Sequence, residues 1–266
     1  MTNDAAREAA NLLWQRWQAG EVIDALPEHC RPRTRAEGYA VQAMLPVISG
    51  CAVQGWKIAA TSVAGQKHIA VNGPLAGRLL AGRIATDGAS VPSAGNRMRV
   101  AEPEFAFRFG MDLAPRVREY SVAEVLAAVA TLHPALEIPD SRYVDFTKVG
   151  EAQLIADNAC AHHFVLGAAT TADWRSIDLV THRVHGEVHN AGACRLERDG
   201  SGEAVLGDPR IALAWLANEL SKLGVTLAAG QVVTTGVCMV PLAILPGDDI
   251  RADFGALGRV SVRVEA

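Results

Sequence analysis

The sequence predicts an α+β fold with many strands and few helices. Short apolar runs bounded by Gly, Pro, Asn and Asp dominate from Ala52 onward, and this pattern is typical of strands. Helical patterns are confined to the N-terminal region and to two later segments. Because helices do not alternate regularly with strands, a doubly wound sheet is not expected. Half of the 266 residues are hydrophobic, which is enough to form a large core.

The N-terminal region is predicted to be helical. Asp4 is expected to cap a helix over residues 4–19, and a second helix is expected over residues 34–50. The pattern changes to short apolar runs after this point. We therefore divide the chain into a helical N-terminal segment, residues 1–50, and a main domain, residues 51–266.

The main domain is predicted to contain strands interrupted by two helices. One helix begins with a capping box formed by Ser121 and Glu124. The other has Asp208 as its N-cap, Pro209 in its first turn and Gly224 just past its end. The predicted strands are 52–60, 97–109, 133–139, 162–167, 177–185, 230–236, 248–253 and 258–264.

Composition excludes several classes of partner. The net charge of −4 and the lack of any Lys/Arg block argue against binding to nucleic acid or to a membrane surface. No run reaches the apolar length needed to span a bilayer, and the acidic N-terminus has no signal-peptide core. The five cysteines are scattered and form no Cys-x-x-Cys pair. These features predict a cytoplasmic protein with reduced thiols.

The predicted strand 97–109 carries two acids on one face. Alternate side chains of a strand share a face, so Glu102 and Glu104 project together with Cα atoms roughly 6.6 Å apart. Phe105 and Phe107 occupy the other face and are expected to be buried. The acids would then lie on a rigid wall rather than on a loop.

A third acid, Glu137, is the only charge between Pro134 and Pro139. A charged group embedded in apolar sequence tends to be paired or functional. Together with Glu102 and Glu104 it could complete an all-oxygen site for a divalent metal, which would neutralise the repulsion between the carboxylates. The alternative is that Glu102 and Glu104 form a solvated strand face, and the residues alone leave it open.

Lys57 is one of only four lysines and lies in an apolar predicted strand. Desolvation or a nearby cation would lower its pKa toward use as a general base. Alternatively, its stem lies along the core while its ammonium group reaches water. The sequence leaves both interpretations open.

Other motifs give no support for different chemistry. The glycines between residues 55 and 82 form neither a Walker loop nor a dinucleotide fingerprint, and no Gly-x-Ser-x-Gly elbow is present. Adjacent His162 and His163 are expected on opposite faces of a strand. At most one of them could therefore enter any given site.

Several short motifs occur along the chain in a specific order and spacing. They are Gly55-Trp56-Lys57-Ile58, Gly77-Arg78-Leu79-Leu80, Glu102-Pro103-Glu104-Phe105-Ala106-Phe107, Pro134-Ala135-Leu136-Glu137-Ile138, Asp140-Ser141-Arg142, Asp157-Asn158-Ala159, Trp215-Leu216-Ala217-Asn218 and Ala229-Gly230-Gln231. Together they resemble the 2-keto-4-pentenoate hydratase branch of the fumarylacetoacetate hydrolase superfamily, which also includes 4-oxalocrotonate decarboxylases. The resemblance extends from about Ala36 to the C-terminus.

The resemblance implies a fold, a metal and roles for four residues. Glu102, Glu104 and Glu137 would be ligands of Mg²⁺ or Mn²⁺, and Lys57 would be the active-site lysine. Residues 51–266 would form a catalytic domain of the fumarylacetoacetate hydrolase type, with a mixed β-barrel or β-roll and flanking helices. Relatives of this kind usually assemble into homo-oligomers.

Three positions depart from the pattern of these relatives. A Pro-Asp-Phe-Gly segment is replaced by Pro74-Leu75-Ala76-Gly77, so a carboxylate is missing at Leu75. A Gly-Ser-Leu/Phe-Thr segment that helps to hold the substrate carboxylate is replaced by Gly236-Val237-Cys238-Met239. Hydroxyl donors are therefore missing at Val237 and Met239, and the substrate-binding pocket is expected to be more apolar.

The implied activity is a metal-dependent hydratase of aromatic catabolism. It would add water to a 2-hydroxydienoate or 2-oxoalkenoate and give a 4-hydroxy-2-oxo acid. A 4-oxalocrotonate-type decarboxylase is the nearest alternative, because the same enolate stabilisation serves both reactions. A C–C bond hydrolase of the acylpyruvate type is a further alternative and would need an acid or a histidine to activate water. The chain could also be a catalytically silent subunit that associates with a homologous hydratase or decarboxylase.

Overall fold

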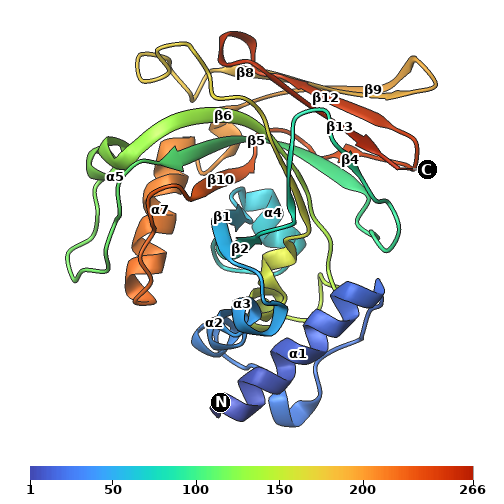
Figure 1. Cartoon of the computed structure of the whole chain (residues 1–266), viewed down its shortest axis with the longest axis vertical. Coiled ribbons are helices and arrows are strands. Elements are labelled where there is room, and N and C mark those ends of the chain that lie inside the picture. The colour runs from blue at the N-terminus through green and yellow to red at the C-terminus, as the bar shows by residue number, and fades with distance from the viewer. Residues whose placement is uncertain (266) are drawn as a thin grey trace.

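The computed structural model describes residues 1–265, which form seven α-helices and thirteen strands (Figure 1). The helices are α1 (Asn3–Ala19), α2 (Arg35–Ala43), α3 (Leu45–Ser49), α4 (Val63–His68), α5 (Val122–Ala128), α6 (Glu151–Ala156) and α7 (Pro209–Lys222). The strands are β1 (Val53–Ala59), β2 (Leu75–Leu80), β3 (Ile84–Thr86), β4 (Ser90–Val91), β5 (Val100–Phe109), β6 (Val129–Ile138), β7 (His163–Leu166), β8 (Arg183–Asn190), β9 (Ala193–Ser201), β10 (Val232–Val237), β11 (Leu242–Ala243), β12 (Asp249–Asp253) and β13 (Arg259–Val264).

The larger sheet is mixed and strongly curved. It has eight strands in the order β2-β1-β10-β5-β6-β7-β3, and β11 pairs with the start of β5. Strands β5 and β6 arch over β1, β2 and α4 (Figure 1). The expected mixed β-barrel or β-roll is confirmed in part, because the sheet is curved but its terminal strands β2 and β3 do not pair with each other among the described residues. The sheet is a half-barrel with a concave and a convex face.

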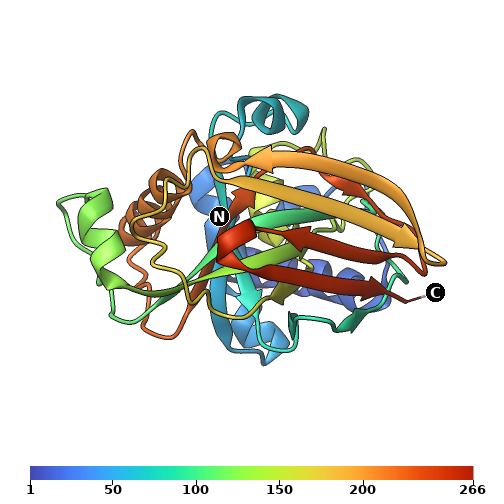
Figure 2. The ribbon, with the colours of Figure 1, turned by 90° about the horizontal axis from the view of Figure 1, so that it is seen from above.

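A second sheet covers the convex face of the half-barrel. Its five strands follow the order β4-β13-β12-β8-β9 (Figure 2). Phe105, Phe107 and Phe109 of β5 point into the core with Val188 and Ile250 of the second sheet. The alternation predicted along β5 therefore holds, since the phenylalanines are buried between the sheets while the acids face the concave side. Burying an aromatic or large aliphatic side chain contributes about 1.5–3 kcal/mol, so this core fixes the register of β5.

The N-terminal helices pack beneath the half-barrel, as Figure 1 shows. Helix α1 buries Ala9 and Leu13 in a cluster that also contains Tyr143 and Ala156 of the main domain. Thr2, rather than the predicted Asp4, is the N-cap, because its side chain accepts the backbone N–H of Ala5. The predicted helix over 34–50 is two helices, α2 and α3. The proposed boundary at residue 50 stays a prediction.

Several elements of the main domain escaped the sequence patterns. Strand β2 was not predicted, because all six of its residues are buried and no alternation marks it. Strand β9 is almost entirely polar and exposed, so no apolar run indicates it. The predicted strand 177–185 is wrong over most of its length, since the strand there, β8, begins only at Arg183. Short helices α4 and α6 were not predicted.

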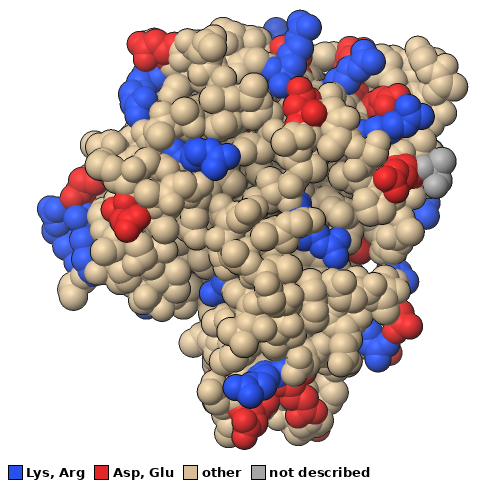
Figure 3. Space-filling view, in the orientation of Figure 1, with Lys and Arg blue, Asp and Glu red and all other residues tan. Residues whose placement is uncertain are grey.

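The surface carries both signs of charge. Most of the face shown in Figure 3 is uncharged, and Lys, Arg, Asp and Glu side chains are scattered over it without a large patch of one sign. Within residues 1–265, none of the helices is both long and apolar enough to cross a membrane. The surface therefore gives no support for a polyanionic partner on this face.

Gly77 provides a test of how closely β1 and β2 are packed. A Cβ atom at Gly77 would lie 2.5 Å from the carbonyl oxygen of Asn158 and 3.0 Å from the Lys57 stem. We expect Gly77→Ala to lower the free energy of unfolding by about 1–3 kcal/mol, because overpacking forces neighbouring atoms apart. Urea unfolding measures this loss. Gly73→Ala is the matched control, since a Cβ there meets nothing within 4 Å, and equal stability of the two variants would contradict the packing described.

Candidate metal centre and active site

Three glutamates meet on the concave face of the half-barrel. Glu102 of β5 and Glu137 of β6 are direct cross-strand partners, and Glu104 lies two residues further along β5. One carboxylate oxygen from each lies within 4.8 Å of the others. Like charges placed directly opposite each other destabilise a sheet. This arrangement therefore needs a compensating positive charge.

A bulge in β10 holds the carboxylate of Glu104. The pairing of β10 with β5 shifts between Thr234 and Val237, and Gly236 there has a φ of 102°. The backbone N–H of Gly236 donates to Glu104 Oε2 at 2.7 Å, and the Thr234 hydroxyl donates to the same oxygen. Position 236 requires glycine, because a Cβ would lie 2.1 Å from Thr61 Oγ1.

Lys57 reaches the acids from β1. Its Nζ lies 3.0 Å from Glu137 Oε1 and donates to the carbonyl oxygen of Ala159 at 3.0 Å. In the sheet, β10 and β5 lie between β1 and β6, so in a flat sheet the outer two strands would be roughly 14 Å apart. The curvature of the half-barrel and the length of the lysine side chain together close this distance.

A strained turn positions the Ala159 carbonyl. Asn158, Ala159 and Cys160 all have positive φ, between 51° and 60°. The Asn158 side chain fixes the turn, since it accepts from the Arg78 backbone N–H at 2.6 Å and donates to the Arg78 carbonyl at 2.8 Å. Non-glycine residues adopt such angles only where the surrounding structure holds them. Strand β2 thereby determines where the Lys57 ammonium group is held.

Burial and mutual repulsion dominate the electrostatics of the three acids. Burial, together with the charge of Glu137, raises the pKa of Glu102 to about 7. The same two causes, with the charge of Glu102, raise the pKa of Glu104 well above its ordinary value. Burial also raises the pKa of Glu137, although its ion pair with Lys57 opposes this. The carboxylates therefore favour proton uptake unless a cation neutralises them.

The pKa of Lys57 is shifted in the direction opposite to the sequence-based expectation. Burial alone would lower it, but the charges of Glu137, Glu102 and Glu104 outweigh burial and raise the pKa. Lys57 is thus a buried ammonium ion rather than a neutral amine. The alternative in which its ammonium group reaches bulk water is also wrong, because the residue is only 2% exposed.

The donor set fits a hard divalent cation. Three carboxylates and one ammonium group leave two negative charges uncompensated when all four residues are ionised. Glu104 Oε1 and Glu137 Oε2 are buried and have no hydrogen-bond partner among the described residues. Buried anionic oxygens without partners are costly, and carboxylate oxygens are the ligands that such cations prefer.

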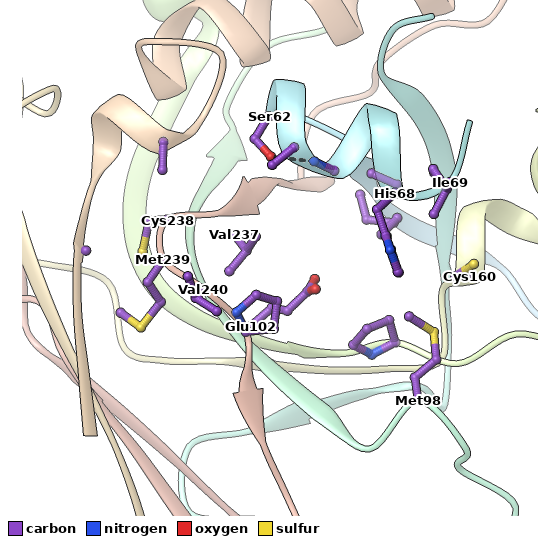
Figure 4. A pocket seen from close by; sticks show the side chains of 18 of the residues that line it. Ser62, His68, Ile69, Met98, Glu102, Cys160, Val237, Cys238, Met239 and Val240 are labelled. Atoms are coloured by element: carbon purple, nitrogen blue, oxygen red, sulfur yellow. Dashed lines mark hydrogen bonds between the residues drawn. The ribbon is translucent and has the colours of Figure 1, made fainter. Parts of the chain in front are cut away.

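A cavity of about 810 Å³ opens onto this cluster (Figure 4). Glu102 and Lys57 line it, whereas Glu104 and Glu137 lie buried behind them. The structure also places the predicted substrate-binding residues Leu75, Val237 and Met239 in its wall. Its volume lies within the roughly 300–1,000 Å³ typical of small-molecule sites.

Sequence reasoning missed other residues of the cavity wall. His68 projects into the cavity from α4, on the side opposite Glu102 (Figure 4). Asp199 of β9 and Glu203 of the short 3-10 helix after β9 also line the cavity. Neither α4 nor the segment around β9 has an apolar pattern in the sequence. No sequence signal therefore linked these residues to the glutamates.

Fold and site together define an α+β protein with a carboxylate centre suited to a divalent cation and a cavity suited to a small organic acid. Residues 81–265 match the family model described as fumarylacetoacetate (FAA) hydrolase C-terminal. The chain therefore belongs to the fumarylacetoacetate hydrolase family.

The closely similar relatives include hydratases and decarboxylases. The chain is 31% identical to a 2-keto-4-pentenoate hydratase of Paraburkholderia xenovorans, over 100% of this chain and 97% of the relative. It is 32% identical to a 4-oxalocrotonate decarboxylase of a Pseudomonas species, over 78% of this chain and 77% of the relative. The solved 4-oxalocrotonate decarboxylase from Pseudomonas putida G7, complexed with magnesium and adipate, superposes with a TM-score of 0.86 at 27% identity, covering 99% of this chain and 98% of that chain.

Glu104→Gln tests the carboxylate centre. The amide keeps the shape of the side chain but removes one anionic ligand, so we expect divalent-metal affinity to fall at least tenfold in isothermal titration calorimetry. Because binding displaces protons from Glu102 and Glu104, wild-type affinity should rise as the pH increases through about 7. Chelation should abolish turnover, and Mg²⁺ or Mn²⁺ should restore it.

Glu28→Gln serves as the matched control for this experiment. Glu28 is an exposed acid of the N-terminal segment, so its variant should bind metal as the wild type does. Unchanged turnover after exhaustive chelation, or equal metal affinity in both variants, would contradict the assignment.

Proposed function

We propose that this protein is a metal-dependent hydratase that converts a 2-hydroxydienoate, through its 2-oxoalkenoate form, into a 4-hydroxy-2-oxo acid in aromatic catabolism. The observation that carries the proposal is the junction of Glu102, the buried Glu104 and Glu137, and Lys57 at one end of a cavity with a largely apolar wall. The similarity to 2-keto-4-pentenoate hydratases along the whole chain supports the same reaction class.

Glu102, Glu104 and Glu137 would hold the metal, for which we propose Mg²⁺ or Mn²⁺. The cation would supply the positive charge that stabilises the enolate of a 2-oxo acid. Lys57, held as an ammonium ion beside Glu137, would donate a proton or a hydrogen bond to the reacting acid. The Ala159 carbonyl and Glu137 keep its Nζ in place for this step.

The wall of the cavity favours a monocarboxylate with an apolar substituent. Leu75, Val237 and Met239 offer no side-chain hydrogen-bond donor to a second polar group. Apart from Lys57, His68 is the only lining side chain within residues 1–265 that could carry positive charge. Glu203 adds negative charge to the wall and would repel a second carboxylate, whereas Asp199 is paired with Arg183 and His185.

A decarboxylase of the 4-oxalocrotonate type is the second candidate. The close structural match to the Pseudomonas putida G7 decarboxylase supports it, and the glutamate centre serves either reaction. The negative charge of the cavity wall argues against a decarboxylase, because 4-oxalocrotonate carries two carboxylates. A catalytically silent subunit is less well supported, since all three glutamates are present and clustered, and Lys57 pairs with Glu137.

We also propose a homo-oligomer located in the cytoplasm. In the single chain, Val63 and Val240 expose 69% and 63% of their surface. Val240 lines the cavity, and Val63 lies in α4 next to residues that line it. A contact with a second subunit would cover this exposed apolar surface at the edge of the cavity. All five cysteines are free thiols, as expected for a reducing compartment.

Lys57→Met tests the role of the ammonium group. If Lys57 moves a proton or stabilises developing negative charge, we expect kcat to fall roughly 10²-fold or more under saturating metal, while metal still binds. Lys67→Met is the matched control, because Lys67 is an exposed lysine of α4. A kcat within about threefold of the wild type in Lys57→Met would indicate a purely structural role.

The substrate range tests the apolar wall. We expect weak turnover of 2-hydroxypenta-2,4-dienoate and at least tenfold higher kcat/KM for a longer 2-hydroxydienoate with an alkyl substituent. Each lost hydrogen bond to a charged carboxylate is worth roughly 1.5–3 kcal/mol, which corresponds to about ten- to a hundredfold in affinity. Initial rates with both substrates measure the preference.

The product identifies the reaction. If the protein is a hydratase, NMR should detect a 4-hydroxy-2-oxo acid as the product. Stoichiometric release of CO₂ from 4-oxalocrotonate would instead favour the decarboxylase. Fast, tight use of the unsubstituted pentadienoate would contradict the roles given to Leu75, Val237 and Met239.

A further inference from the structure

A second cavity, of about 290 Å³, lies apart from the active site and shares no lining residue with it. It is bounded by the C-terminal end of α1, the loop before β5, the loop after β6 and the start of β7. Nothing in the proposed reaction uses it. Its wall carries four arginines, two histidines and Trp17, and this composition indicates a different ligand.

Arg83 presents a guanidinium group without an acceptor. It lies over the Trp17 ring at 5.0 Å and has no hydrogen bond or ion pair within the described part of the chain. Arg142 lies over the same ring at 4.4 Å, but its donors are used by Asp157 and by the carbonyls of Asp140 and Ala161. Burial and the charge of Arg142 lower the pKa of Arg83, as expected for a guanidinium group that has no ion pair.

The two histidines add a second set of unused polar atoms. Trp17 Nε1 donates to His162 Nδ1 at 2.8 Å, and since indole nitrogen only donates, neutral His162 must carry its proton on Nε2. That Nε2 donor is buried without a partner among residues 1–265, as is Nε2 of His163. The expectation that the two rings point to opposite faces is wrong, because His162 precedes β7, and the ring centroids lie 4.3 Å apart.

The remaining charges of the wall do not compensate Arg83. Glu21 pairs with Arg16, and the Asp140 carboxylate accepts the backbone N–H groups of Arg97 and Met98. Among the described residues, the Arg97 side chain donates to the carbonyls of Gly20 and Gly95 and to no other group.

Both histidines are neutral, so they offer no counter-charge either. Burial and neighbouring positive charge lower the pKa of His162 to about 2 and that of His163 to about 4. The wall therefore combines excess positive charge with buried donors that lack acceptors.

We propose that this cavity binds a small oxyanion, a phosphate or a carboxylate, through the Arg83 guanidinium and the Nε2 donor of His162. A planar guanidinium pairs with two oxygens of such an anion at once, and the stacking on Trp17 fixes its plane. The proposal is independent of the hydratase reaction.

Titration calorimetry with inorganic phosphate and with acetate, at constant ionic strength and with chelator present, tests the proposal. We expect saturable binding of at least one anion to the wild-type protein and at least tenfold weaker binding to Arg83→Gln. Arg83→Lys should bind with intermediate affinity, because it keeps the charge but loses the two-pronged geometry. Arg198→Gln, at an exposed position of β9, is the matched control and should bind as the wild type does.

The Glu104→Gln variant separates this cavity from the metal centre. Anion binding should persist in that variant, since Glu104 does not line the second cavity. Preference for phosphate or for acetate identifies which of the two anions the site takes. Absence of binding to the wild type, or equal affinity in wild type and Arg83→Gln, would overturn the proposal.

Discussion

The charge cluster that Lys57 forms with Glu102 and the buried Glu104 and Glu137 is the constraint on which the rest of the structure depends. These groups lie on strands that are not all neighbours, and Lys57 Nζ still comes within 3.0 Å of Glu137. A flat sheet would keep them apart, so the curvature of the larger sheet is a condition for the site. Uncompensated buried charge is expensive, and the cluster is therefore stable only with its full set of partners.

The two faces of β5 explain how such a cluster is kept rigid. The phenylalanines on the convex face are packed between two sheets. This packing fixes the backbone of β5 and so positions the acids on its concave face. Small backbone features complete the arrangement. The bulge at Gly236 supplies a donor to Glu104, and the turn at Asn158 supplies an acceptor to Lys57. Each feature satisfies one group that burial would otherwise leave unpaired.

Local sequence rules predicted the features that depend on nearby residues. The alternation around Glu104 and Phe105 and the caps at Ser121 and Asp208 are of this kind, and the structure confirms them. The sign of the Lys57 pKa shift was not predictable in this way, because it depends on three acids brought in from two other strands.

His68 escaped prediction for the same reason, since only the fold brings α4 over the cavity. The family resemblance supplied the grouping of Glu102, Glu104 and Glu137 that periodicity alone left open. It gave no information about β9, whose polar sequence lacks any apolar alternation.

The bulge of β10 separates two tasks within four consecutive residues. The backbone N–H of Gly236 holds Glu104, and the backbone N–H of Cys238 donates to the Pro103 carbonyl at 3.0 Å, while the side chains of Val237 and Met239 line the cavity. Main-chain contacts do not depend on side-chain identity. Mutations at 237 and 239 can thus reshape the pocket during evolution without disturbing the ligand that β10 supports. A lineage of such enzymes can acquire new substrates by drift at these positions, while the chemistry inherited with the glutamates stays constant.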